Sequence, residues 1–329
     1  MHADPLETAP RVEGDIGDGR LGYEVVDVFT ARAFAGNPLA VVYGADRLSS
    51  EQMLSLATEF NLSETAFPLA LTPADREAGA DYRVRIFTPG GEVPFAGHPT
   101  LGTAWALRAR GDIGGGDVTQ ACGAGLIAVH LPSDHTRPVA LSAVARDAAR
   151  ELTPTEVADV VPLVGLTVDD VAGPAHVAGC GLTWLYLRVS PEAVSRARPS
   201  STRLCEVSLN QSALTDPLDG IDVYAVAARP AAAGDDLQVF SRVFVPGLGI
   251  PEDPATGSAA VGLGLALVAA GLAAADGQTS YRIEQGVEMG RPSLLIGRVE
   301  ASNGLGRRAH VAGRVVPIAT GTIAVPPLP

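Results

Sequence analysis

The sequence predicts an α+β protein built from two similar halves, each a curled sheet wrapped around one buried helix. Three observations predict this fold. The chain has 329 residues, 47% of them apolar, which is enough to form two hydrophobic cores. Most local patterns are typical of short strands rather than helices. One block of sequence that ends in an apolar helix occurs twice, once in each half.

The two copies of this block span residues 85–107 and 242–267. Both contain a strand, a Pro/Gly turn, an acidic loop, a helix start made of small residues and an apolar helix, and the second copy has a three-residue insertion before the acidic loop. The aligned pairs include Arg85/Arg242, Phe87/Phe244, Glu92/Glu252, Gly97/Gly257 and Gly102/Gly262. Upstream of the blocks, we expect Val26–Phe29 and Ile221–Tyr224 to be the paired first strands of the halves.

Strands are expected where short runs of β-branched and aromatic residues are bounded by Gly, Pro, Asn or Asp. These runs are residues 25–29, 39–43, 82–87, 126–131, 182–189, 237–245 and 307–324. Helices are expected where a helical pattern follows a start signal such as Ser or Pro. These segments are residues 50–60, 99–110, 154–164, 191–196 and 258–274. Strands and helices do not alternate strictly, which argues against a doubly wound parallel sheet.

The chain ends and the repeat suggest where the domains lie. Residues 1–20 are polar and acidic, without a secretory signal pattern, and predict a disordered tail on a cytoplasmic protein. We expect an N-terminal domain over residues 21–128, completed by a C-terminal strand near residues 318–329. The second domain is expected over residues 129–317.

Composition excludes several classes of function. The net charge of −13 and the lack of a basic run argue against nucleic acid and anionic membranes as partners. All 24 basic residues are Arg, which excludes a lysine Schiff base and a P-loop. The three widely spaced cysteines, Cys122, Cys180 and Cys205, favour neither a zinc site nor a disulfide framework. The uncharged stretch Pro254–Ala275 is rich in Ala and Gly, which favours a buried helix over a membrane span.

The repeated helix starts suggest a binding site for a small acid. The first N–H groups of a helix lack intrahelical partners, and the helix dipole favours an anion beside them. Such starts occur at Gly97–Thr100 and at Thr256–Ala259. If the halves pack about a pseudo-twofold axis, the two starts meet and their amides hold a carboxylate. The alternative is that both are ordinary helix starts in which Gly allows close packing.

Three side chains are candidates for moving a proton. Glu64 lies between a helix and an apolar strand, as either a turn cap or an acid/base group in a semi-apolar cleft. Asp253 precedes the second helix start and is either a helix cap or an anchor for a substrate amine. His98 either fills space or donates to a substrate oxygen.

Five motifs together resemble the PhzF family of phenazine biosynthesis isomerases. They cover residues 27–42, 61–67, 87–100, 252–259 and 284–293, in the family's order, within a similarity that spans roughly residues 22–326. The resemblance implies a diaminopimelate epimerase-like fold, in which two pseudo-symmetric domains are each a β-barrel around a central α-helix. The active site of such proteins lies between the domains.

The resemblance also implies roles for individual residues. Glu64 matches the family's acid/base carboxylate, which moves a proton during isomerisation of a dihydro-hydroxyanthranilate. His98 and Asp253 match further catalytic residues, and the substrate-binding positions are Gly97, Gly257 and Ser258. The family implies a homodimer that needs no metal or organic cofactor.

Two alternatives remain open at this stage. One is an amino-acid epimerase that uses Glu64 with His98 or Asp253 on opposite faces of the substrate. The epimerase relatives use two cysteines at the paired helix starts, whereas this chain has His98 and Ser258 there, which argues against a two-thiol racemase. The other alternative is a non-catalytic protein that binds a small acid in the same cleft.

Overall fold

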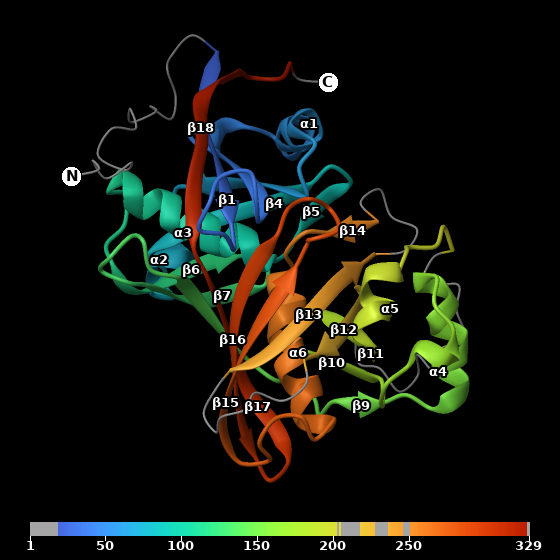
Figure 1. Ribbon diagram of the computed structural model, residues 1–329. Coiled ribbons are helices and arrows are strands. Elements are labelled where there is room, and N and C mark those ends of the chain that lie inside the picture. The colour runs from blue at the N-terminus through green and yellow to red at the C-terminus, as the bar shows by residue number, and fades with distance from the viewer. Residues whose placement is uncertain (1–18, 203, 205–217, 228–235, 246–250, 328–329) are drawn as a thin grey trace, which may run out of the picture. The chain divides into compact units, whose positions relative to one another are not determined.

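The computed structural model describes residues 19–202, 204, 218–227, 236–245 and 251–327 (Figure 1). The chain divides into two compact units. Unit 1 comprises Met1–Leu141 with Gly313–Pro329, and unit 2 comprises Ser142–Ala312. The predicted tail lies mostly outside the described residues, but its last predicted residue, Arg20, already begins the first strand.

Unit 1 is a mixed sheet with three α-helices in its described part. Its strands are β1 (Arg20–Val28), β2 (Asn37–Val42), β3 (Glu64–Leu69), β4 (Tyr82–Thr88), β5 (Gly91–Val93), β6 (Gly116–Cys122), β7 (Gly125–Leu131), β8 (Val139–Val144, which crosses the unit boundary) and β18 (Val315–Ala324). Its helices are α1 (Ser50–Phe60), α2 (Pro73–Glu77) and α3 (Gly97–Arg110), with a short 3-10 turn at Ala45–Arg47.

Unit 2 has the same kinds of element. Its strands are β9 (Arg150–Glu151), β10 (His176–Gly179), β11 (Thr183–Arg188), β12 (Gly220–Val226), β13 (Leu237–Phe244), β14 (Glu252–Asp253), β15 (Gly277–Gln285), β16 (Ser293–Ser302) and β17 (Leu305–Gly313). Its helices are α4 (Pro154–Val160), α5 (Pro191–Arg196) and α6 (Gly257–Ala269), with 3-10 turns at Val161–Val164 and Val168–Asp170.

The two units have the same order and orientation of neighbouring strands, although the edge strand β18 of unit 1 is the last strand of the chain and its counterpart β9 is the first strand of unit 2. In unit 1 the neighbours run β18–β1–β2–β3–β4–β6–β7–β8, with β2–β3 and β4–β6 parallel and the other pairs antiparallel. In unit 2 they run β9–β10–β11–β12–β13–β15–β16–β17, with β11–β12 and β13–β15 parallel. The short strands β5 and β14 pair with β4 and β13. This match confirms the repeat and the α+β class.

The shared order of neighbouring strands corrects one expected equivalence. Val26 lies in β1, whose counterpart in unit 2 is β10, whereas Ile221–Tyr224 belongs to β12, the counterpart of β3. The two segments are similar because each has an Asp between apolar residues. A four-residue pattern does not encode which strands become neighbours.

The unit boundary also differs from the predicted one after residue 128. That point falls within β7, which pairs along its length with β6 and then with β8 as consecutive antiparallel strands. The chain therefore stays in unit 1 until Leu141, inside β8. At the other end, the expected strand 307–324 is two strands, β17 and β18, separated at Arg314, whose carbonyl accepts a hydrogen bond from the Thr30 N–H.

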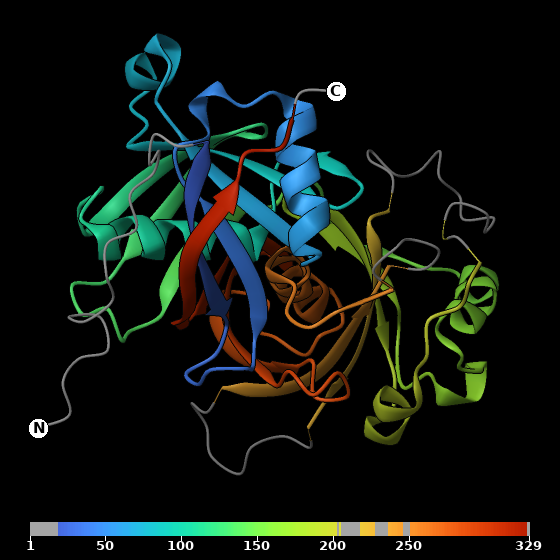
Figure 2. The ribbon, with the colours of Figure 1, turned by 90° about the horizontal axis from the view of Figure 1, so that it is seen from above.

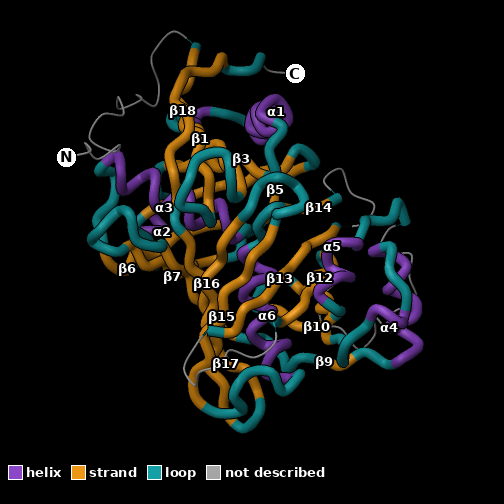
Figure 3. The backbone as a smooth tube through the Cα atoms, viewed as in Figure 1, coloured by secondary structure: helices purple, strands orange, loops and turns teal. Residues whose placement is uncertain are grey.

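One helix in each unit is enclosed by strands of its own unit. α3 contacts β1, β2, β3, β7 and β18, and α6 contacts β10, β11 and β16. Figure 2 looks nearly along α6 and shows strands curving around it, and Figure 3 shows the same strands in orange. A Cβ at Gly102 would lie 2.7 Å from Leu39 Cδ2, and one at the aligned Gly262 would lie 2.2 Å from the Tyr186 hydroxyl. Both aligned glycines therefore permit close contact between helix and strand.

α6 ends earlier than the sequence suggests, at Ala269 rather than residue 274. Gly271 adopts a φ of 67°, and the N–H of Leu272 donates to the Leu267 carbonyl. This is a glycine-terminated helix end. None of the described helices combines the length and the hydropathy that a bilayer-spanning helix needs.

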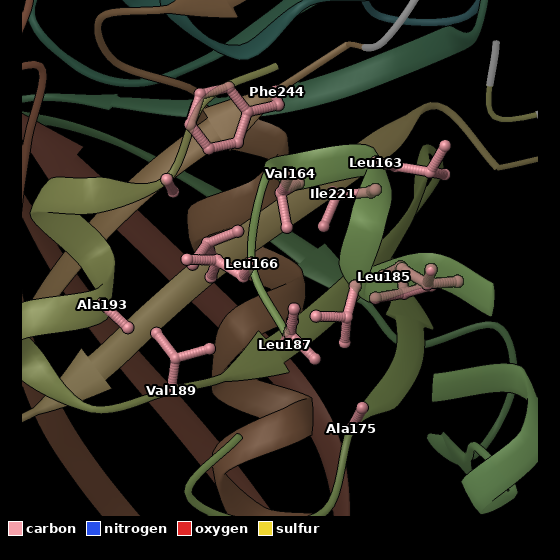
Figure 4. Close-up of a cluster of buried hydrophobic side chains, with 14 of the residues drawn as sticks. Leu163, Val164, Leu166, Ala175, Leu185, Leu187, Val189, Ala193, Ile221 and Phe244 are labelled. Carbon is pink, nitrogen blue, oxygen red and sulfur yellow. The ribbon is translucent and has the colours of Figure 1, made fainter. Parts of the chain in front are cut away.

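Separate hydrophobic clusters hold the outer helices against each sheet. In unit 2, Leu163, Val164 and Ala193 from the outer turns and helix pack on Leu185 and Ile221 of the sheet (Figure 4). In unit 1 the equivalent cluster joins α1 to the strands, and its members are Leu21, Val42, Ala45, Met53, Leu56, Ala57, Phe67 and Phe87. The helix that precedes β3 in unit 1, α1, and the helix that precedes its counterpart β12 in unit 2, α5, are thus both packed against the sheet.

The repeat also preserves an ion pair between the paired strands. Arg85 Nε donates to Glu92 Oε1 at 2.7 Å, and Arg242 Nε donates to Glu252 Oε1 at 2.8 Å. Each guanidinium lies 5.0 Å from the ring of the Phe two residues later. The pairs differ in burial, because the Arg85 side chain is 22% exposed and that of Arg242 is 4% exposed.

Glu252→Gln is expected to lower the free energy of unfolding by about 3 kcal/mol, because it leaves the buried Arg242 charge without its bidentate partner. The matched control is Glu92→Gln at the aligned position, which we expect to change stability by less than about 1 kcal/mol because that pair is more exposed. Urea unfolding of both variants measures the difference. Equal losses of stability would contradict the conclusion that the Arg242–Glu252 pair is the more deeply buried of the two ion pairs.

Candidate active site

Unit 1 places Glu64 next to His98. Glu64 begins β3 and His98 is the second residue of α3, and Glu64 Oε2 lies 3.5 Å from His98 Nε2. The Glu64 side chain is 18% exposed and that of His98 is 3% exposed. Asn61 ends α1 with a φ of 49°, and its N–H donates to the Ala57 carbonyl. The turn at Asn61 therefore directs the chain into β3 with Glu64 as its first residue.

His98 is held neutral by its surroundings. Burial lowers the pKa of His98 to about 3, so the imidazole carries a single N–H at neutral pH. Its Nδ1 lies 3.2 Å from the Nδ2 of Asn37, a residue that is itself fully buried. His98 can thus act as a neutral donor or acceptor, but not as a cation.

Asn37 was not among the residues that the sequence predicted for the site. It begins β2, and the parallel pairing of β2 with β3 matches Leu39 to Glu64. Gly36 before it has a φ of 70°, and a Cβ there would lie 2.2 Å from the Val28 carbonyl oxygen. A side chain at position 36 would therefore displace Asn37. The available signal was a polar residue between a glycine and an apolar strand.

Among the described residues, the starts of the two central helices have no side-chain cap. Within the described parts of the chain, neither the N-cap of α3, Ala96, nor that of α6, Thr256, makes a side-chain capping hydrogen bond. Gly97 and Gly257 are the first helical residues. An anion placed at either start would lie at the positive end of the helix dipole, where the first N–H groups have no intrahelical partners.

Unit 2 brings Asp253 to the start of α6. Asp253 Oδ2 accepts a hydrogen bond of 2.6 Å from the Thr256 hydroxyl, one residue before Gly257. Gln285 fixes this turn, because its Nε2 donates to the Asp253 carbonyl at 2.8 Å and its Oε1 accepts from the Thr256 N–H at 3.2 Å. Ser258 follows as the partly exposed second residue of α6. Gln285 lies in the family motif at residues 284–293, but the sequence analysis predicted no role for it.

The predicted residues thus form two groups. Unit 1 brings together Glu64, Gly97 and His98, and unit 2 brings together Asp253 with the helix start at Gly257 and Ser258. The described residues include no group of three His, Cys, Asp or Glu side chains that could hold a metal ion. Cys122 and Cys180 are free thiols, and Cys205 lies outside the described residues.

A surface hollow of about 280 Å³ lies elsewhere in unit 1, at the C-terminal end of α3. Tyr43, Leu69, Tyr82 and Arg110 are among the residues that line it. Arg110 is twelve residues beyond His98 in α3, or roughly 18 Å along the helix axis. None of the predicted site residues lines this hollow.

Comparison with known proteins places these observations in a family. The sequence matches the family of phenazine biosynthesis-like proteins over residues 26–321. The trans-2,3-dihydro-3-hydroxyanthranilate isomerase of Pseudomonas chlororaphis is 36% identical over 311 residues, which cover 92% of this chain and 99% of that protein. An uncharacterized isomerase of Mesorhizobium japonicum is 32% identical over 321 residues, which cover 92% of this chain and 98% of that protein.

Solved structures with a similar fold include two that cover more than 90% of this chain. The PhzF-family phenazine biosynthesis protein of Bacillus anthracis has a TM-score of 0.77 at 22% identity, over 93% of this chain and 99% of that one. A predicted epimerase of Pseudomonas aeruginosa has a TM-score of 0.72 at 29% identity, over 92% of this chain and 98% of that one. The fold and the relatives together define an enzyme of the isomerase class. The chain belongs to the phenazine biosynthesis-like, or PhzF, family, as its motifs indicate.

Proposed function

We propose that this chain is a cofactor-independent isomerase that moves a proton between two carbons of a small carboxylate metabolite. The contact between Glu64 and the neutral His98 is the observation that carries the proposal. The substrate is of the type that the 36% identical relative is named for, a trans-2,3-dihydro-3-hydroxyanthranilate. Such a role belongs to secondary metabolism.

Glu64 would take a proton from a carbon beside an unsaturated system and return it to another carbon of the same molecule. Loss of that proton leaves a delocalised anion, whose charge the neutral His98 and the amides at Gly97 would stabilise. Burial of Gly97 and His98 in the first turn of α3 supports this role, because it would hold both groups in place. The Glu64 side chain is 18% exposed, although its Oε2, the oxygen nearest to His98, is buried.

The group in unit 2 would complete the site. The amides at Gly257 and the Ser258 hydroxyl would bind the substrate carboxylate, and Asp253 would anchor a substrate amine. This part of the proposal requires one substrate molecule to contact both helix starts. The same proposal includes closure of each sheet into a barrel, a homodimer in solution and a cytoplasmic location, all as in the family to which the motifs belong.

The test is to incubate the protein with trans-2,3-dihydro-3-hydroxyanthranilate in deuterated water and to follow the carbons by NMR. We expect a product with a shifted double bond, and deuterium at the carbon that receives the proton wherever the carried proton exchanges with solvent. Exchange that inverts one stereocentre without moving a double bond would instead indicate an epimerase. Binding with neither isomerisation nor exchange would contradict enzymatic function for this ligand.

A further inference from the structure

We propose that Asn37 is a positioning residue that selects the tautomer of His98, so that the single N–H of the imidazole is on Nε2 and faces Glu64. The catalytic consequence of this inference rests on the proposed function. Its structural content, the position of one proton on one ring, can be measured independently of any substrate.

The two ring nitrogens of His98 face side chains on two different strands. His98 Nδ1 lies 3.2 Å from Asn37 Nδ2 on β2, and His98 Nε2 lies 3.5 Å from Glu64 Oε2 on β3. Asn37 is fully buried and His98 is 3% exposed, so water competes little for either nitrogen. Each nitrogen therefore takes its role from the protein group that it faces.

The chemistry of the amide fixes the assignment. An Asn Nδ2 carries two hydrogens and can only donate, so the nitrogen opposite it must be an unprotonated acceptor. A neutral imidazole with an unprotonated Nδ1 carries its hydrogen on Nε2. Because His98 stays neutral, this hydrogen points toward Glu64 throughout the neutral pH range.

The consequence for Glu64 follows from the direction of this donor. A neutral N–H that faces a carboxylate favours its charged form, which is the form that removes a proton from substrate. The opposite tautomer would present a lone pair to the carboxylate and repel it. At 3.5 Å the contact is long for a hydrogen bond, and it would tighten with a small side-chain movement when substrate excludes water.

The backbone around Asn37 supports a fixed orientation. The preceding loop is held by buried Asp27, whose Oδ2 accepts from the Phe34 N–H at 2.7 Å. Thr30 Oγ1 accepts from the Arg32 N–H at 3.1 Å within the same loop. Since Gly36 also tolerates no Cβ, Asn37 enters β2 from a constrained turn.

The experiment records long-range proton–nitrogen NMR spectra of the full chain with 15N-labelled histidine, and identifies His98 by the signals missing in His98→Asn. The wild type should show an unprotonated Nδ1 and a protonated Nε2 for His98, without titration between about pH 5.5 and 8.5. A protonated Nδ1 with a bare Nε2, or an imidazole that titrates in this range, would overturn the proposal. The wild-type spectrum decides this even if no variant folds.

The Asn37→Asp variant tests whether Asn37 selects the tautomer of His98. A carboxylate at position 37 has the same shape but can only accept, so the hydrogen should move to Nδ1, or both nitrogens should become protonated. We expect kcat to fall roughly tenfold or more with KM less affected. The matched control is Asn303→Asp in an exposed turn of unit 2, which changes charge equally and should leave both the His98 spectrum and kcat unchanged. An unchanged His98 tautomer in folded Asn37→Asp would refute the role of Asn37.

The two proposals fail in different ways. If the tautomer is as stated but no substrate is isomerised, the positioning by Asn37 stands and the proposed reaction is wrong. If isomerisation occurs while His98 carries its hydrogen on Nδ1, the reaction stands and the positioning is wrong.

Discussion

Glu64→Gln is expected to lower kcat by roughly 10²- to 10⁴-fold, the range attributed to a positioned acid/base group. The amide has the shape of the carboxylate but cannot accept a proton from carbon. Because Glu64 is partly exposed and begins a strand, the free energy of unfolding should change by less than about 1 kcal/mol. Ligand binding should be retained, since the proposed carboxylate contacts come from the helix starts.

Steady-state kinetics measure kcat, and urea unfolding of the same preparations measures the free energy of unfolding. Glu59→Gln is the matched control, because Glu59 is an exposed residue of α1 that lies five positions before Glu64. It removes the same charge and should leave kcat unchanged. Turnover by Glu64→Gln close to that of the wild type would refute Glu64 as the proton carrier, whatever the fate of the other site residues.

A second large effect is expected for stability, at Asp222. This residue of β12 is 1% exposed, and its Oδ1 accepts a hydrogen bond of 2.6 Å from the Ser241 hydroxyl. Burial raises the pKa of Asp222 from 3.8 to about 7, against the opposing effect of the Ser241 hydrogen bond. The folded protein therefore keeps a proton here at pH values where the unfolded chain has lost it.

The direction of the pH effect follows from this difference. The stability contribution is fully present below about pH 3.8 and is lost as the pH rises toward 7, because the unfolded state binds fewer protons in this window. Asp222→Asn keeps an oxygen for Ser241 and cannot ionise. The free energy of unfolding of Asp222→Asn, relative to that of the wild type, should thus rise by about 3 kcal/mol between pH 5 and pH 8.

Urea unfolding at the two pH values measures this change. Asp169→Asn is the control, since Asp169 is exposed in the same unit and its removal should give no such pH-dependent difference. A constant offset between Asp222→Asn and the wild type across this range would show that Asp222 is not protonated in the folded protein.

The repeat made much of the fold predictable. The aligned pairs Arg85/Arg242 and Gly102/Gly262 have the same structural roles in both units, because an ion pair and a close helix contact each impose a residue type at a fixed place. The order of the strands in the sheet was less predictable from the sequence. β10 has only four residues, so its pattern is too short to identify it as the counterpart of β1.

Candidate site residues could be chosen from the sequence where a motif combines local geometry with chemistry. Glu64 and His98 lie 34 residues apart in sequence and in contact in the structure, and each was identified from its own motif. Asn37 and Gln285 were not, because their roles depend on contacts across strands, 61 and 29 residues away in sequence. A single amide side chain in a strand carries no local sign of what it faces.

The most direct measurement of the central claim is a crystal structure of the full chain with a stable carboxylate analogue of the substrate. We expect the Glu64 carboxylate to lie against the carbon that exchanges its proton, with the ligand carboxylate at the N–H groups of Gly257. We also expect groups from both units to touch the same molecule. A ligand bound away from Glu64, or a Glu64 side chain turned into bulk solvent with the helix starts far apart, would contradict the account.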